Sequence, residues 1–221
     1  MSFFTTYSKK LENLIAAVIF LITFAVYFST MAPTVSFWDT GEFIATSHIL
    51  GVPHPPGSPL FLLVGKFFSL IPLSSDIAFR VNIFSPIISA LTISLLFLIC
   101  NEFIDRVDTN DDNRFFKMWS SLTASLTFAF THSHWFNAVE TEVYAFSGFM
   151  TALVVYLIML WSKKIDDSSH VVYLMLISYI IGLATGLHLL NLLTIPFIGL
   201  IIYHTIGKLS CLLYTSDAAD E

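Results

Sequence analysis

The apolar stretch Leu14–Thr30, with the sequence LIAAVIFLITFAVYFST, decides the fold class of this chain. It contains no charged side chain, and it is long enough to cross a bilayer as a helix, which takes about 17–25 apolar residues. The pair Lys9-Lys10 precedes it, as in a signal peptide. The apolar run is too long for such a peptide, however, and no small-residue cleavage site follows it. The sequence therefore predicts a first membrane span.

The composition extends this interpretation to the whole chain. Of its 221 residues, 56% are hydrophobic and only 12% are charged, whereas a soluble domain carries about 25% charged residues. No basic patch of the kind that nucleic acid binding requires is present. The two cysteines, Cys100 and Cys211, are far apart and lie outside any CxxC spacing, so they indicate neither a disulfide framework nor a cysteine metal site.

Five later segments have the apolar character of further spans. They are roughly Val81–Phe103, Phe116–Thr131, Val143–Trp161, Val171–Gly186 and Leu189–His204. The segment between the first two spans, Met31–Phe79, is interrupted by six prolines, which break a helix interior. We expect short helices over Glu42–Leu50 and Pro59–Ile71, both too short to cross. The predicted fold is an all-α, multi-pass bundle of about six spans with juxtamembrane helices in the first outer loop.

The placement of lysine and arginine predicts the orientation of this bundle. With the N-terminus in the cytoplasm, eight of the ten cationic side chains lie inside and only Lys66 and Arg80 lie outside. This asymmetry fits the excess of positive charge in cytoplasmic loops. The outer side then receives several polar side chains that sequence alone brings to one face. They are Asp39, Glu42, His54, Asp76, Arg80, His132, His134, Glu140, Glu142 and, near the membrane edge, His188.

The stretch Phe37–Phe43, with the sequence FWDTGEF, follows the first span directly. The spacing of Asp39 and Glu42 is typical of helix capping, and on spacing alone we favour that interpretation. The alternative is that a carboxylate acts as a general base or as a metal ligand. A general base needs a raised pKa, which the apolar setting of Trp38 and its phenylalanine neighbours could supply. Capping and catalysis do not exclude each other.

Three further positions have two interpretations each. The turn at His54, within HPPGSP, is either a rigid link between two helices or a device that presents the imidazole to a phosphate or hydroxyl. Arg80 is either an interfacial anchor or a phosphate ligand. The Gly-x-x-x-Gly spacing before His188 usually indicates helix packing. The alternative is that His188 contacts a lipid headgroup. Glu142 and Tyr144 either begin a helix or add an acidic wall to the site.

Several of these stretches resemble one membrane family. They are WDTGEF at 38–43, GVPHPPGSPL at 51–60, RVN at 80–82, EVY at 142–144 and GLH at 186–188. The pattern is similar to the bacterial protein O-mannosyltransferase-like family, long catalogued as a domain of unknown function and related to a vertebrate O-mannosyltransferase. Members of this family look like glycosyltransferases of the GT-C superfamily. The resemblance covers about residues 10–208.

The resemblance implies an inverting glycosyltransferase in the bacterial inner membrane, with its site facing the periplasm. The donor would be a polyprenyl-phosphate sugar, carrying mannose, and the acceptor a Ser or Thr hydroxyl of a protein or peptide. Asp39 would be the catalytic base with Glu42 in support, while His54, Arg80 and His188 would bind the donor phosphate or lipid. Trp38, Glu142 and Tyr144 would contact substrate. No cofactor is certain, and the sequence leaves the need for a divalent metal open, since no clear Asp-x-Asp occurs in the outer loop.

A transporter or a lipid-binding membrane protein without catalysis is the alternative function. It would place charged residues in the middle of several spans and would use paired broken helices, whereas here the polar groups gather at one mouth. Residues 1–210 are expected to be the N-terminal part of the transmembrane domain of a longer protein. The last eleven residues, CLLYTSDAADE at 211–221, resemble a translated sequencing adapter and are expected to be non-native.

Overall fold

A computed structural model of the chain describes residues 2–108 and 113–206, with side chains from residue 9 onward. The described part is helical and contains no strand, which confirms the all-α prediction. The expected non-native tail at 211–221 lies outside the described residues. The helices are α1 (Ser2–Thr30), α2 (Thr40–Ile49), α3 (Pro59–Leu70), α4 (Ile77–Asn82), α5 (Phe84–Val107), α6 (Arg114–Ala129), α7 (His132–Ala138), α8 (Val143–Ser162), α9 (His170–Thr185) and α10 (Thr194–Ile206), with the 3-10 helix η2 (Leu189–Leu193) before α10.

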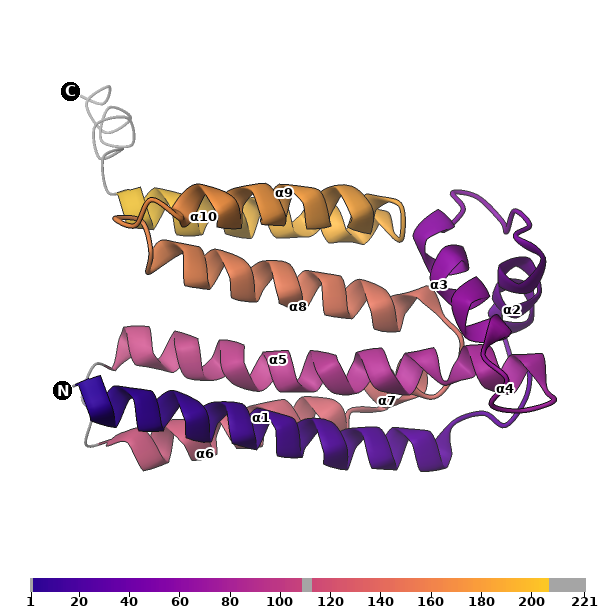
Figure 1. Ribbon diagram of the computed structural model, residues 1–221, viewed down its shortest axis with the longest axis horizontal. Coiled ribbons are helices and arrows are strands. Elements are labelled where there is room, and N and C mark those ends of the chain that lie inside the picture. The colour runs from indigo at the N-terminus through magenta and orange to yellow at the C-terminus, as the bar shows by residue number, and fades with distance from the viewer. Residues whose placement is uncertain (1, 109–112, 207–221) are drawn as a thin grey trace, which may run out of the picture.

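The long helices lie side by side and run back and forth along one axis (Figure 1). Helix α1 begins and α10 ends at the same end of this bundle, which we call the terminal end (Figure 1). The short helices α2, α3 and α4 cover the opposite end, here the capped end (Figure 1). The prediction of short helices inserted between the first two spans is therefore confirmed.

Four helical segments of the described chain are long and apolar enough to cross a membrane. They are Lys9–Thr30, Ile77–Val107, Val143–Ser162 and Leu189–Ile206. The other two expected spans form α6 and α9, of 16 residues each. A helix of that length extends only about 24 Å, less than the roughly 30 Å of a hydrocarbon core. The multi-pass prediction is thus confirmed, and two of the six expected spans are shorter than a typical crossing.

Helix α5 is the central helix of the bundle because it is buried on two sides. Phe84 and Ile88 pack into a cluster formed with α3, α8 and α9. Ile93 and Phe97, both fully buried, pack against α1 and α6. A helix that is apolar all round is expected in such a position. The hydroxyl of Ser94 donates to the carbonyl oxygen of Ala16 at 2.8 Å and joins α5 to α1.

Charged side chains at the terminal end are paired with opposite charges. Glu102, almost buried, accepts from the Lys163 amine at 2.6 Å and lies 3.5 Å from Arg106. Lys117 lies 3.4 Å from Asp105, and the Arg114 guanidinium lies 3.6 Å from Glu12. Other contacts of the same kind join Lys164 to Asp167. This end of the bundle therefore carries balanced charge.

Asn82, at the last position of α4, connects three segments at the capped end. Its side chain is fully buried, and its Nδ2 donates to the carbonyl oxygens of Ala32 at 2.9 Å and Thr34 at 3.0 Å. Its Oδ1 accepts from the Thr141 hydroxyl. The loop that follows α1 and the linker between α7 and α8 are thereby held against α4. Both the Nδ2 donor and the Oδ1 acceptor of this buried amide therefore have partners, as buried polar groups generally do.

We predict that Asn82→Ala destabilises the fold far more than a surface asparagine does. The change leaves two carbonyl groups, of Ala32 and Thr34, and the buried Thr141 hydroxyl without their partner, and a buried polar group without a partner costs about 1–3 kcal/mol. We expect a loss of about 2–4 kcal/mol in the free energy of unfolding, measured by denaturant unfolding in detergent micelles. The control is Asn113→Ala, an exposed amide that bonds to Asp108. Equal losses for the two variants would contradict the role given to Asn82.

Candidate functional site

Asp39 begins helix α2 at the capped end, but its side chain does not cap the helix. Its carbonyl oxygen accepts the first helical hydrogen bond, from the backbone N–H of Phe43 at 2.9 Å. Its carboxylate makes no capping bond and is exposed to solvent. The capping interpretation of Asp39 is therefore wrong. The carboxylate is left free for an external partner, which is what a general base or a ligand requires.

Glu42, in the first turn of α2, binds His54 instead of capping its own helix. One carboxylate oxygen accepts from the His54 backbone N–H at 2.7 Å, and the other lies 2.8 Å from Nδ1 of the His54 ring. These hydrogen bonds lower the pKa of Glu42 and raise the pKa of His54. The turn thus places the His54 ring beside the Glu42 carboxylate, while its donation to a phosphate or hydroxyl stays a prediction.

The turn after His54 is stiff in the way that its sequence predicts. The Pro55-Pro56 peptide bond is cis, and Gly57 adopts a φ of +76°, which only glycine adopts without strain. The edge of the His54 ring faces the ring of Phe43, with 5.7 Å between the centroids, and Phe43 is itself buried. Backbone geometry and one aromatic contact thus fix the imidazole beside Glu42.

Asp39, Glu42 and His54 form a compact group of potential metal ligands. One oxygen or nitrogen atom from each residue lies within 4.8 Å of the others. Two carboxylates and one imidazole are a ligand set that divalent cations accept. Sequence spacing did not indicate this group, because His54 is separated from Glu42 by a turn whose path only the fold defines.

Two buried glutamates, Glu140 and Glu142, lie behind this group in the linker before α8. The pKa of Glu142 is raised from its ordinary value of 4.5 to about 7, first by burial and then by the charges of Asp39 and Glu140. Burial also raises the pKa of Glu140. Glu142 was predicted as an acidic wall of the site, and the structure brings it within electrostatic reach of Asp39 and His54.

Glu140 was not among the predicted site residues. The Ser36 hydroxyl donates to one of its carboxylate oxygens at 2.7 Å, while the other oxygen is buried without a hydrogen-bond partner. Because that bond uses the single O–H of Ser36, the Ser36 oxygen accepts from the hydroxyl of Thr40, the residue after Asp39, at 3.2 Å. The only sequence signal was the pair of acids in Glu-Thr-Glu at 140–142. Helix N-termini commonly carry such acids, so the pattern alone could not identify a site.

His188 and Tyr144 meet at the edge of the same end. Their ring centroids are 5.4 Å apart, and Nδ1 of His188 accepts from the backbone N–H of Leu190 at the start of η2. The turn that carries His54 is bonded to this segment, because the Ser58 hydroxyl donates to the Leu187 carbonyl oxygen at 3.0 Å. The fold therefore gathers residues predicted from stretches 130 positions apart in the sequence.

Two predicted residues are placed differently from the others. The Arg80 charge acts on Asp76, and no hydrogen bond or ion pair in the described chain joins Arg80 to the carboxylates of the site. Its Nε atom is buried without a partner. Trp38 has a positive φ of 58° and is 81% exposed. The expected apolar wall around Asp39 is thus missing on the Trp38 side, where the ring is free to act as an interfacial anchor.

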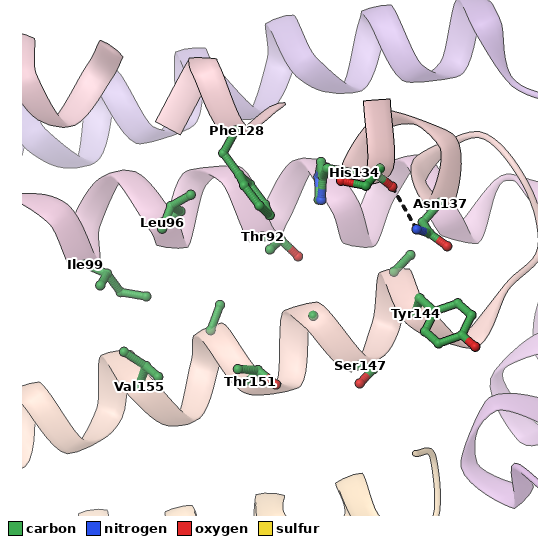
Figure 2. Close-up of a pocket in the computed structure, with 14 residues that line it drawn as sticks. Thr92, Leu96, Ile99, Phe128, His134, Asn137, Tyr144, Ser147, Thr151 and Val155 are labelled. Atoms are coloured by element: carbon green, nitrogen blue, oxygen red, sulfur yellow. Dashed lines mark hydrogen bonds between the residues drawn. The ribbon is translucent and has the colours of Figure 1, made fainter. Parts of the chain in front are cut away.

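A cavity of about 560 Å³ runs from Tyr144 into the bundle (Figure 2). Thr92, Leu96 and Ile99 of α5 line one side of it, at the spacing of a single helix face. Helices α6, α7 and α8 supply the other sides, which include Phe128, His134, Asn137, Ser147, Gly148, Thr151 and Val155. The residues near Tyr144 are mainly polar, and those near Ile99 are mainly apolar (Figure 2).

The cavity was not expected from the sequence. Gly148 contributes to it by lacking a side chain, since a Cβ atom added there would meet nothing within 4 Å. Burial lowers the pKa of His134 to about 4, so the ring is neutral at pH 7, and its Nε2 atom has no hydrogen-bond partner. The volume lies within the range of ligand pockets, about 300–1,000 Å³.

Comparisons with known proteins identify related chains. The family model described as "Protein O-mannosyl-transferase TMEM260 N-terminal domain" matches residues 39–210. The protein O-mannosyl-transferase tmem260 of Dictyostelium discoideum is 27% identical over 203 residues, which are 86% of this chain and 23% of that protein. The protein O-mannosyl-transferase TMEM260 of Mus musculus is 31% identical over 142 residues, or 62% of this chain and 18% of that protein. The chain thus spans less than a quarter of the length of these relatives. No solved structure matches it.

We predict that the stability of the capped end depends on pH through Glu142. Its folded-state pKa is above its unfolded value, so the stabilisation is present below pH 4.5 and is lost as the pH rises towards 7. A shift from 4.5 to about 7 corresponds to a loss on the order of 3 kcal/mol. Thermal unfolding in detergent between pH 4.5 and 8 measures it. Glu142→Gln, which cannot ionise, should unfold with a flatter pH profile than the parent protein. Parallel profiles for the two would contradict this assignment.

Proposed function

Because this chain belongs to the family of the protein O-mannosyl-transferase TMEM260 N-terminal domain, we propose that it forms the catalytic end of a membrane glycosyltransferase. In this proposal the protein moves mannose from a lipid-phosphate donor to a Ser or Thr hydroxyl of an acceptor protein. The relatives are named for protein O-mannosyl transfer, and the chain is a multi-pass helical membrane protein. The identity of the donor, the residue that acts as base and the side of the membrane that the site faces are parts of the proposal.

The free carboxylate of Asp39 is the observation that carries the proposal. It stands at the start of α2, exposed and without a capping bond, beside the Glu42–His54 pair. A general base needs an acceptor atom within hydrogen-bond reach of the substrate proton. Glu42 is already engaged with His54, and Glu142 is almost buried. Asp39 is therefore the carboxylate best placed to receive a substrate hydroxyl.

The proposed reaction is a single inverting displacement. Asp39 takes the proton of the acceptor hydroxyl while the hydroxyl oxygen forms a bond to the anomeric carbon of the sugar. The bond between that carbon and the phosphate oxygen breaks, and its electron pair leaves with the lipid phosphate. Holding donor and acceptor in line at one surface supplies much of the rate enhancement.

Charge that develops on the leaving phosphate needs a positive partner. Glu42, with smaller contributions from Asp39 and Glu142, raises the pKa of His54 and so favours its protonated form. Arg80 and His188 lie at the same end and remain candidates for donor binding, with the Arg80 Nε still without a partner. Trp38 and Tyr144, both exposed, remain candidates for substrate contact.

The cavity below Tyr144 supports a lipid-linked donor. Its polar part reaches Tyr144, two residues after Glu142, and its apolar part extends along α5 and α8 (Figure 2). An amphipathic ligand with a charged head and a hydrocarbon chain matches this gradient of polarity, because each part would meet groups of its own kind. The carbohydrate end would then lie towards Asp39.

The distribution of cations supports a site on the extracytoplasmic side. Most described lysines and arginines lie towards the terminal end, and only Lys66 and Arg80 belong to the helices of the capped end. The excess of positive charge marks the cytoplasmic side. In the proposed orientation the candidate site therefore faces away from the cytoplasm. A bacterial inner membrane remains the prediction from sequence.

We predict that Asp39→Asn in the protein expressed from the complete gene lowers sugar transfer by about 10²–10⁴-fold, the usual contribution of a general base. The assay uses a lipid-linked mannose donor and a Ser/Thr peptide, and donor binding is measured in parallel. Asp166→Asn is the matched control, because Asp166 is an exposed carboxylate in the linker between α8 and α9. Undiminished transfer by the Asp39 variant would remove Asp39 from this role.

Filling the cavity tests the place of the lipid chain. We expect Gly148→Leu to raise the KM for the lipid-linked donor roughly tenfold, since about 1.4 kcal/mol of lost binding has that effect, with little change in kcat at saturating donor. Gly182→Leu in α9 is the control, because Gly182 also has open space at its Cβ but lies outside the cavity. The same rise in KM for both variants would show that the cavity does not hold the donor.

A further inference from the structure

We propose that Asp39, Glu42 and His54 form a binding site for one divalent cation, such as Mn²⁺ or Mg²⁺, at the mouth of the capped end. The role of that cation, to hold the phosphate of the donor, rests on the proposed function. The site itself rests on the geometry and the charge balance of the described residues. Neither the family match nor the names of the relatives mention a metal.

The ligand atoms are already assembled. One atom from each of the three side chains lies within 4.8 Å of the others. Glu42 and His54 are held in place by two hydrogen bonds, one from the backbone N–H and one at Nδ1. A cation bound between Nδ1 and the carboxylate would replace the proton that they share, so binding would release protons. Asp39 makes no side-chain capping bond that a cation would have to break.

The site is open, which suits a cation that also binds substrate. Asp39 and His54 are exposed, and Glu42 is half-buried. Three protein ligands leave several of the six positions of Mg²⁺ or Mn²⁺ for water or for phosphate oxygens, as is usual for cations that bind phosphate substrates. Asp39 has two carboxylate oxygens, so one can bind the cation while the other accepts the proton of the acceptor.

The buried glutamates behind the three ligands are the second, independent observation. Glu140 is 3% exposed and Glu142 is 6% exposed. One oxygen of Glu140 has no hydrogen-bond partner, and Ser36 ties its other oxygen to the hydroxyl of Thr40, next to Asp39. Burial of two carboxyl groups without a counter-charge is costly, and a cation bound at the exposed ligands would lower that cost.

The two ends of the bundle differ in how their acids are compensated. At the terminal end, Glu102 has both Lys163 and Arg106 as partners, and Glu12 has Arg114. At the capped end, four carboxyl groups have only the His54 imidazole among the described side chains. They are Asp39, Glu42, Glu140 and Glu142. A bound divalent cation would supply the missing positive charge.

The charge balance also matters for the proposed donor. A phosphate group that approaches the carboxylates of Asp39 and Glu42 is repelled by them. A cation bound between the carboxylates and the phosphate makes the interaction of the phosphate with the site attractive. The structure thus offers a physical reason for acidic residues at a site that receives an anionic substrate.

Direct cation binding tests the site without an activity assay. The full-length protein is purified in detergent, stripped with a chelator, and titrated with Mn²⁺ alone, with free Mn²⁺ followed by electron paramagnetic resonance. We expect one site per chain, with affinity at least tenfold lower in Asp39→Asn and in Glu42→Gln. Asp166→Asn should bind as the parent protein does. Circular dichroism melting of each variant verifies that it is folded.

Three outcomes would overturn the cation site. They are no saturable Mn²⁺ binding by the folded parent protein, binding that survives the combined Asp39→Asn and Glu42→Gln changes, and an equal loss in the Asp166 variant. Transfer that persists in excess chelator, with no Mn²⁺ binding, would reject the site and leave the proposed transferase standing. Mn²⁺ binding together with undiminished transfer by Asp39→Asn would support the site and reject the base.

Discussion

The buried amide of Asn82 is the interaction on which the candidate site depends. It joins the loop after α1, the end of α4 and the linker before α8 through three hydrogen bonds. Asp39 follows the first of these segments and Glu142 belongs to the last, so their separation is defined by this amide. A second contact, from the Ala32 N–H to the Val139 carbonyl oxygen, strengthens the same junction. Without the Asn82 amide, the loops that carry these acids would lose the three hydrogen bonds that join them through α4.

The distribution of charge gives the bundle two different ends. At the terminal end the acids of the ion pairs have basic partners, and the almost buried Glu102 has two, Lys163 and Arg106. At the capped end, acids gather around one imidazole, two of them buried and one with its pKa raised to about 7. A fold does not need such an arrangement for stability. Strongly perturbed carboxyl groups beside free ligands are typical of places where a charged substrate or ion binds.

Much of this architecture could be predicted. Apolar runs of span length predicted the long helices, and the prolines predicted the short ones, because hydrocarbon length and a missing N–H act locally. The lengths of α6 and α9 were less predictable, since their ends depend on packing against neighbours. At the site, the pairing of His54 with Glu42 and the nearness of Glu142 were anticipated. The interpretation of Asp39 as a cap was wrong, because a spacing of three residues is the same whether or not the side chain turns back to the helix.

By itself, the sequence determined that this chain is a multi-pass helical membrane protein, which end of it carries the conspicuous acids, and which family its stretches resemble. Composition and residue spacing suffice for these, since they depend on local chemistry. Only the tertiary structure decided that the Asp39 side chain makes no capping bond, that Glu140 is buried with Ser36 as its partner, that the charge of Arg80 acts on Asp76, and that a cavity reaches Tyr144. Those features come from side chains far apart in the sequence, and their distances are set by packing around α5 and by the bonds of Asn82.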